Sequence, residues 1–360
     1  MKGRVGVGAA KIPGRLPLPA ISQNNSTGKA DNKALGWLIR MPRYHSLPPV
    51  AHLAQPLMQT ILGANGTIGS ALARQLPTLT TEPLRLVSRH LQRVNATDEL
   101  LPADLTDAAQ TGHAVAGSAV VYLVAGLPYN TKVWQTDWPR LMTNVLDACE
   151  KHGAKLVFFD NVYMYGAVNG PMTEATPFNP VSRKGEVRAR IARQLLDAMQ
   201  AGRVSALIAR AADFYGPGIA NAVPNTLILD NLKKGKAAQW LSSADQLHSF
   251  TFTPDAGRAT AVLGTTASAF GQTWHLPTAA PALTARQFAE QAATHYGVSP
   301  KITVLPKLAM RALGLFMEPV RESVEMLYQY DQPYVFDSSK FDQRFFAATP
   351  YAEGIRRAAL

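Results

Sequence analysis

Residues 59–76 read Gln59-Thr-Ile-Leu-Gly63-Ala-Asn-Gly66-Thr-Ile-Gly69-Ser-Ala-Leu-Ala-Arg-Gln-Leu76. A short apolar run is followed by three spaced glycines and then by the amphipathic pattern of a helix. The glycines suit a sharp turn after a strand, a close approach of the backbone to a pyrophosphate, and tight helix–strand packing. Phosphates would sit at the helix N-terminus, where free N–H groups and the helix dipole favour an anion. We therefore predict a dinucleotide site in which Asn65, Thr67 and Ile68 accompany the glycines.

The end of the next predicted strand determines which dinucleotide is preferred. Residues 84–90 read Leu84-Arg-Leu-Val-Ser88-Arg89-His90, an apolar run that ends in polar residues. An Asp or Glu here would bind the ribose 2′-hydroxyl of NAD, whereas an arginine accommodates the 2′-phosphate of NADP. Because Arg89 stands here without an acid, we expect NADP, with NAD as the alternative. The alternative role for Arg89 is that of an ordinary surface residue.

Apolar strands and helices alternate along the rest of the first half of the chain. Buried-type strands are predicted near 100–105, at 119–126, 155–159 and 204–210, with a helix over 134–151. This alternation predicts an α/β fold with a doubly wound parallel (Rossmann) sheet. We expect a dinucleotide-binding domain over 58–212. A smaller C-terminal substrate lobe, interleaved with the last strands, should cover 213–360.

Composition narrows the class of protein. The net charge of +11 is concentrated in residues 1–57, where eight Lys and Arg face the single Asp31. These residues are rich in Gly, Pro and Ser and show no periodicity, so we expect a disordered extension or a misassigned start, with Met58 as the true one. The remaining charge is ordinary for an enzyme, which argues against nucleic acid as a partner. Transit-peptide targeting is the less favoured reading of the basic extension.

Cysteine content and hydropathy add two further limits. The single cysteine, Cys149, excludes an intrachain disulfide framework and a cysteine-based metal cluster, and it fits a small buried helical residue. No apolar run is long enough to span a membrane. We therefore expect a cytoplasmic protein without a bound metal, whose partner is a small-molecule substrate.

Several further motifs together resemble the extended short-chain dehydrogenases/reductases, the NAD(P)-dependent epimerase/dehydratase group. They are listed here beside the glycine turn: Asp104-Leu105, Tyr122-Leu-Val124-Ala125-Gly126, Asn144, Val162-Tyr163-Met-Tyr165-Gly166, and Arg210-Ala-Ala-Asp213-Phe-Tyr215-Gly216-Pro217-Gly218. The resemblance implies that Asp104 and Leu105 meet the adenine, and that Val124 and Ala125 line the cofactor site. It also implies that the loop from Asp213 faces nicotinamide and substrate. Homodimers are common in this group, so a homodimer is possible here.

The family's catalytic residues are a Ser or Thr after the fifth strand, then a Tyr and a Lys four residues apart on the next helix. Aligned with this pattern, the chain has Asn161, Lys184 and Arg188 at the three positions. Asn161 can still bind a carbonyl or hydroxyl oxygen. Arg188 can bind a ribose but will not release a proton. Lys184 would need a pKa far below its ordinary value of about 10.4 to shuttle protons near neutral pH.

These substitutions leave two functional hypotheses open. In the first, the protein is an NAD(P)-dependent oxidoreductase or epimerase acting on a small hydroxyl- or carbonyl-bearing substrate, with Lys184 or a nearby tyrosine such as Tyr163 handling the proton. In the second, it is a catalytically silent NADP-binding sensor or regulatory protein. A purely structural alternative also exists, in which Lys184 and Arg188 belong to a solvated helix face.

Overall fold

The computed structural model describes residues 57–219 and 221–359. The predicted extension 1–57 therefore lies outside the described residues, except for Leu57. In the described part, seven strands form one parallel sheet in the order β11-β6-β5-β4-β1-β2-β3. Their bounds are β1 Met58–Leu62, β2 Leu84–Ser88, β3 Glu99–Pro102, β4 Ser118–Leu123, β5 Lys155–Asp160, β6 Ala206–Arg210 and β11 Thr273–His275. The predicted doubly wound α/β fold is confirmed.

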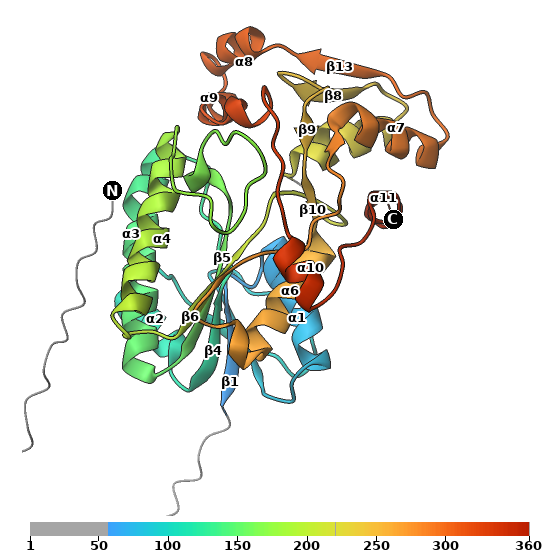
Figure 1. Ribbon diagram of the computed structural model, residues 1–360. Coiled ribbons are helices and arrows are strands. Elements are labelled where there is room, and N and C mark those ends of the chain that lie inside the picture. The colour runs from blue at the N-terminus through green and yellow to red at the C-terminus, as the bar shows by residue number, and fades with distance from the viewer. Residues whose placement is uncertain (1–56, 220, 360) are drawn as a thin grey trace, which may run out of the picture. The chain divides into compact units, whose positions relative to one another are not determined.

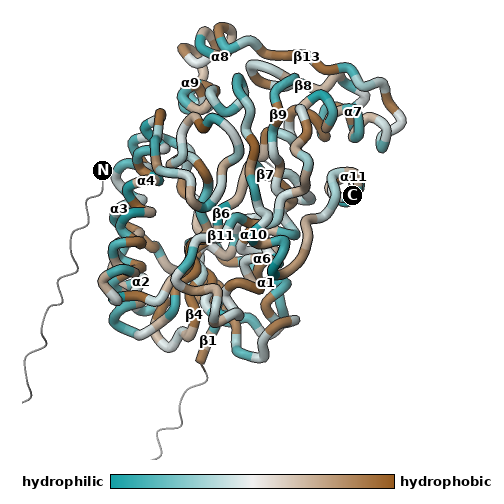
Figure 2. The backbone as a smooth tube through the Cα atoms, viewed as in Figure 1, coloured by the Kyte–Doolittle hydropathy of each residue, from teal (hydrophilic) through white to brown (hydrophobic). Residues whose placement is uncertain are grey.

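Helices cover both faces of this sheet, as Figure 1 shows. On one face lie α2 (Ala108–Val115), α3 (Thr131–His152) and α4 (Arg183–Gln200), whose apolar sides bury Trp138, Leu141 and Ile191. On the other lie α1 (Thr67–Gln75), α6 (Thr253–Thr265) and α10 (Ser339–Arg344). The hydrophobic colour along β1 and β4 in Figure 2 reflects burial from both sides, as expected of a parallel sheet between two helical layers.

The strand order reverses between β1 and β4. Strands β2 and β3 follow β1 toward one edge of the sheet, whereas β4, β5 and β6 lie on the other side of β1, toward the opposite edge. Ligands of doubly wound sheets bind at such a reversal, beyond the carboxyl ends of the strands. The fold therefore directs attention to the loops that follow Leu62 and Leu123.

A second group of elements forms the C-terminal lobe around its own apolar core, which includes Trp240, Phe250 and Phe288. Its strands pair two by two: β7 (Asp213–Tyr215) with β10 (Phe250–Phe252), β9 (Leu247–His248) with β12 (Leu283–Thr284), and β8 (Ala238–Leu241) with β13 (Ile302–Leu305). Its helices are α5 (Asp230–Lys233), α7 (Ala285–Tyr296), α8 (Lys307–Gly314), α9 (Glu318–Val324) and α11 (Tyr351–Ala358). Because β11, α6 and α10 return to the main sheet, the lobe and the sheet domain are interleaved along the chain.

No helix among the described residues is long and apolar enough to cross a membrane.

The contact between α1 and α6 depends on a glycine. A Cβ on Gly257 would lie 2.6 Å from the Cβ of Ala71 and 2.9 Å from its backbone carbonyl carbon. Gly112, on α2, has no such neighbour within 4 Å. We expect Gly257→Ala to lower the free energy of unfolding by about 1–3 kcal/mol through overpacking. Gly112→Ala should raise it by up to about 1 kcal/mol through helix propensity.

Urea unfolding of the two variants beside the wild type measures this difference. The paired design separates packing from propensity, because each variant adds one methyl group to a helix. Equal stabilisation by both substitutions would contradict the close α1–α6 packing.

Candidate functional site

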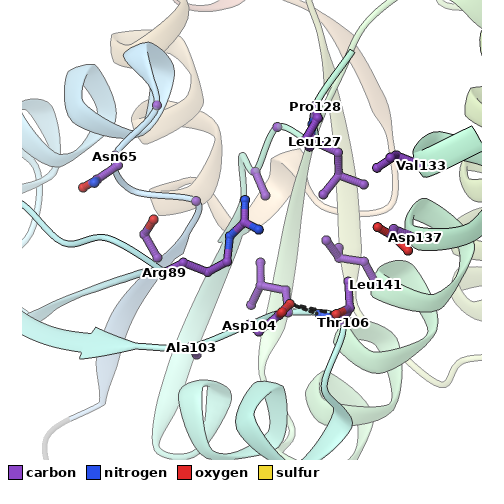
Figure 3. A pocket seen from close by; sticks show the side chains of 16 residues that line it. Asn65, Arg89, Ala103, Asp104, Thr106, Leu127, Pro128, Val133, Asp137 and Leu141 are labelled. Atoms are coloured by element: carbon purple, nitrogen blue, oxygen red, sulfur yellow. Dashed lines mark hydrogen bonds between the residues drawn. The ribbon is translucent and has the colours of Figure 1, made fainter. Parts of the chain in front are cut away.

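A cavity of about 480 Å³ opens where the strand order reverses (Figure 3). Its volume lies in the range typical of small-molecule sites. The lining comes from the loops after β1, β2, β3 and β4 and from the first turns of α3. The lining residues are Gly63, Asn65, Gly66, Ser88, Arg89, Ala103, Asp104, Leu105, Thr106, Ala125, Gly126, Leu127, Pro128, Val133, Asp137 and Leu141.

The glycine turn builds the floor of this cavity. Gly63 has φ +95°, and a Cβ there would lie 2.3 Å from the Cα of Ala125. A Cβ on Gly69 would lie 2.7 Å from the carbonyl oxygen of Gly63, so the third glycine permits the close packing of α1 on β1. No side chain caps α1 at Gly66. Its first N–H groups therefore remain available to an anion such as a pyrophosphate.

Asp104 is fixed at the opposite wall. Its Oδ1 accepts hydrogen bonds from the Thr106 N–H at 2.9 Å and the Thr106 hydroxyl at 2.8 Å, drawn in Figure 3. These bonds, helped by the charge of Arg89, hold the pKa of Asp104 below its usual value. The carboxylate is thus an ionised acceptor at the position predicted to meet the adenine.

Arg89 is exposed at the end of β2, and Figure 3 shows its side chain extended into the cavity. Asn65 also lines the cavity, but its amide ties two loops together: Nδ2 donates to the His90 carbonyl, and Oδ1 accepts from the Gln92 N–H at 3.0 Å. Asn65 therefore shapes the turn through both ends of its amide. Of the predicted cofactor residues, Thr67, Ile68, Gly69 and Val124 do not line the cavity.

The sequence did not predict that residues of α3 line one side of the cavity. Val133, Asp137 and Leu141 are spaced as one face of that helix and point to the cavity in Figure 3. Their spacing predicts only a buried helix face, so the sequence carries no signal that separates them from core residues.

The four predicted catalytic residues lie outside this lining. Lys184 is fully buried, and its ammonium group has four polar acceptors: Glu322 Oε2 at 2.6 Å, Glu325 Oε1 at 3.0 Å, and the Thr131 hydroxyl and Glu322 carbonyl at 2.9 Å each. It also lies over the Tyr129 ring, 4.6 Å from the centroid. Lys184 therefore joins α4 to α9 and the N-terminus of α3, and it is not part of a solvated helix face.

Arg188, one turn further along α4, is committed to a carboxylate. Its Nε donates to Asp160 Oδ1 at 2.8 Å and its Nη2 donates to the same oxygen. The guanidinium also lies over the rings of Trp138 and Phe158, at 4.6 and 5.2 Å. Arg210 adds a second cation to Asp160, at 3.5 Å. Arg188 thus sits in a buried charge cluster at the carboxyl ends of β5 and β6.

Asn161 and Tyr163 follow β5 directly. The Asn161 Oδ1 accepts from the Tyr163 N–H at 3.1 Å, while its Nδ2 donates to no described residue. The Tyr163 ring stacks on Trp134 with centroids 6.2 Å apart. Burial, with the neighbouring Tyr129 and Asp213, raises the pKa of Tyr163 well above its usual value. Both residues can therefore donate a hydrogen bond, and neither is a base near neutral pH.

In the part of the chain that the structure describes, no group of three or more His, Cys, Asp and Glu side chains is arranged to hold a metal ion.

Comparison with known proteins identifies the class of fold and then the family. The structure is similar to that of Thermus thermophilus UDP-glucose 4-epimerase in complex with NAD, at a TM-score of 0.68 and 17% identity, covering 84% of this chain and 98% of that one. It is also similar to Streptomyces venezuelae dTDP-glucose 4,6-dehydratase with NAD bound, at a TM-score of 0.69 and 16% identity, covering 84% and 96%. These likenesses define a Rossmann-type fold.

The sequence model of the NAD dependent epimerase/dehydratase family matches residues 60–274. The chain therefore belongs to that family, as its motifs predicted. No curated protein sequence matches the chain.

The Lys184 cluster makes a pH-dependent contribution to stability. Burial alone would raise the pKa of Glu322, but hydrogen bonds from Lys184 and Thr131 outweigh it, and the pKa is lowered. A lowered pKa stabilises the folded state above the ordinary glutamate value of about 4.3, and this contribution is lost as the pH falls through the folded-state pKa. We expect Glu322→Gln to lower the free energy of unfolding by about 2 kcal/mol at pH 7. The difference from wild type should shrink in acid.

Chemical denaturation over a pH series tests this expectation. Glu353→Gln is the matched control, because Glu353 pairs with Arg356 on the exposed surface of α11, and it should leave the midpoint almost unchanged at every pH. A constant gap between Glu322→Gln and wild type down to the lowest pH would show that the charge of Glu322 contributes nothing.

Proposed function

We propose that this protein is an NAD(P)-dependent oxidoreductase or epimerase/dehydratase-like enzyme acting on a small hydroxyl- or carbonyl-bearing substrate. The observation that carries the proposal is the cavity at the strand-order reversal, with a glycine turn on one side and an ionised Asp104 on the other. The residues present fit a dinucleotide, because Gly63, Gly66 and the uncapped α1 suit a pyrophosphate and Asp104 suits an adenosine. A bound nicotinamide supplies a hydride acceptor or donor.

The chain's own contribution to the reaction is to hold the substrate oxygen. The free Asn161 Nδ2 and the protonated Tyr163 hydroxyl are the donors offered beyond β5. Lys184, predicted to shuttle a proton, is better explained as a structural cation because every proton of its ammonium has a partner. Arg188 is likewise committed to Asp160. Nucleotide sugars, named for the proteins of similar fold, are the first substrates to test.

We further propose a preference for NADP over NAD. The support is Arg89, a cation that extends into the cavity from the end of β2, where the ribose 2′ position of a dinucleotide is bound in this fold. The family is described as NAD dependent, so NAD remains the alternative.

A second function is favoured by one observation. Both cations at the predicted catalytic positions, Lys184 and Arg188, are neutralised by carboxylates of the chain itself. A protein that binds the dinucleotide and performs no chemistry, acting as a sensor or regulatory partner, would have this arrangement.

Cofactor choice can be tested at one residue. Arg89→Asp should lower the affinity for NADPH by at least about tenfold relative to NADH, because a cation beside the 2′-phosphate is replaced by an anion. Fluorescence titration with both cofactors measures the ratio. Arg311→Asp makes the same charge change on an exposed part of α8, away from the cavity, and should leave the ratio unchanged. An unaltered ratio in Arg89→Asp would refute the NADP preference.

Turnover separates the enzyme from the silent binder. The probe panel consists of UDP-glucose, UDP-glucuronic acid and dTDP-glucose for oxidation or epimerisation, and of simple aldehydes and ketones for reduction. We expect turnover with at least one probe. Asn161→Ala should reduce kcat by about 10²-fold with the cofactor affinity unchanged, because a donor to the reacting oxygen is removed. Tight cofactor binding without turnover of any probe would support the silent binder instead.

The same assay tests the predicted role of Lys184. Lys184→Met, corrected for the fraction of folded protein, should retain the wild-type rate per folded molecule if Lys184 is a structural cation. A complete loss of turnover in folded Lys184→Met would restore its role in proton transfer.

A further inference from the structure

Asp213 lies beside the proposed substrate donors because of the sheet register. Strands β5 and β6 are neighbours, Asp160 pairs with Arg210, and the Ala211 N–H donates to the Asp160 carbonyl at 3.1 Å. Tyr163 and Asp213 each stand three residues beyond this last pair. The two segments therefore leave the carboxyl edge of the sheet side by side, where ligands of this fold bind.

One oxygen of the Asp213 carboxylate is fixed and the other is free. Oδ2 accepts hydrogen bonds from His248 Nε2 at 2.9 Å and from the Tyr330 hydroxyl at 3.3 Å. Oδ1 accepts none from the described residues. The Asp213 side chain is 18% exposed, whereas that of His248 is only 3% exposed. The hydrogen bonds to Oδ2 thus orient the carboxylate, and Oδ1 is left available to a ligand.

His248 is itself held in place by aromatic rings. It stacks on Tyr334 with centroids 4.3 Å apart and on Tyr330 at 5.3 Å, with interplanar angles of 17° and 13°. A ring held on two sides cannot easily turn away from Asp213. His248 therefore orients the carboxylate and remains shielded from solvent.

The phenols around Asp213 are donors. Burial first, and then the charge of Asp213, raise the pKa of Tyr330 and Tyr334 well above the usual value. The buried hydroxyl of Tyr334 has no hydrogen-bond partner among the described residues, and Tyr334 is only 5% exposed. Because an unpartnered buried hydroxyl is costly, this phenol remains able to donate a hydrogen bond beside Asp213.

The other carboxylates near the site are already committed. Asp160 is paired with Arg188 and Arg210, and Glu322 and Glu325 are paired with Lys184. Asp213 alone among these four acids has no cationic Lys or Arg partner in the described structure. It is therefore the carboxylate best placed to accept a proton.

We propose that Asp213 is the catalytic base of this enzyme and that His248 is its positioning residue. This inference rests on the proposed function. In the oxidative direction the substrate O–H bond breaks and its proton passes to Asp213 Oδ1. The C–H bond of the same carbon breaks as its two electrons and hydrogen pass to the oxidised nicotinamide, and a C=O bond forms. In the reductive direction the protonated Asp213 returns the proton.

The arrangement also defines what the substrate presents to this point. A secondary hydroxyl can donate to Oδ1 and accept from the phenol donors around it. A phosphate or carboxylate would be repelled by Asp213. The reacting end of the substrate is therefore a neutral, hydroxyl-bearing group.

The test compares Asp213→Asn with wild type on whichever member of the probe panel is turned over. Asn keeps the size and one acceptor oxygen but is not a base. We expect kcat to fall by about 10²- to 10⁴-fold. The dissociation constants of cofactor and probe, measured by isothermal titration without turnover, should change by less than about threefold. Asp245→Asn is the control, because Asp245 is exposed and paired with Arg286.

A second variant tests the positioning role. His248→Gln retains a donor toward Oδ2 but loses the stacked ring, so we expect a smaller fall in kcat, of about tenfold, with KM unchanged. Wild-type kcat in folded Asp213→Asn would overturn the assignment of Asp213 while leaving the proposed function intact. If the wild type binds cofactor but turns over no probe, the proposed function fails, and the base fails with it. A weaker probe affinity with kcat unchanged would show that Asp213 only binds the substrate.

Discussion

The buried ammonium of Lys184 is the constraint on which the arrangement of the site depends. Removing a charged amine from water costs several kcal/mol, and only close partners of opposite charge offset that cost. Glu322 and Glu325 provide two carboxylates, and the Thr131 hydroxyl and a backbone carbonyl complete the shell. Because these partners come from the region of α9 and from the start of α3, the cation fixes a segment of the C-terminal lobe against the loop that follows β4. An ion cluster therefore holds the start of α3 against α9 and α4.

A second group of ion pairs lies one helical turn further along α4, around Asp160. Together, the two clusters determine which polar side chains are not used in ion pairs. Arg188 and Arg210 share Asp160, and Arg210 also donates to the Tyr165 hydroxyl, which contacts His275. Burial lowers the pKa of His275 to about 3, so its ring is neutral. In this cluster, Asp160 is the acid paired with the two arginines. Among the described residues of these clusters and around Asp213, the polar atoms without a hydrogen-bond partner include Asn161 Nδ2, Arg210 Nη2, the Tyr334 hydroxyl and Asp213 Oδ1. Lys184 and Arg188 are thus held in ion pairs, whereas Asp213 keeps one carboxylate oxygen without a protein donor.

Most of the residues predicted to bind the cofactor line the cavity, whereas those predicted to carry the chemistry do not, and this difference has a physical reason. Gly63, Gly66 and Gly69 act through local backbone geometry, and Arg89 and Asp104 follow strands whose order is set by the βαβ rule, so short-range patterns suffice. Lys184 depends on Glu322 and Glu325, which are 138 and 141 residues away in the chain. No periodicity or motif connects them. Asn65 lines the cavity, and its side chain also joins two loops, a long-range role that the motif does not predict.

The long-range pairing links the residue at position 184 to the acids at positions 322 and 325. A lysine at position 184 is tolerable only with acids opposite it, and those acids are tolerable only with the lysine, since two carboxylates close together without a cation repel. A tyrosine at position 184, without further changes, would leave Glu322 and Glu325 close together with no cation between them. Asp213 lies on β7 and outside the Lys184 cluster, so it does not depend on the pairing of Lys184 with Glu322 and Glu325. Its partner His248 lies on β9 of the lobe. A base at Asp213 would therefore depend neither on the Lys184 cluster nor on the glycine turn.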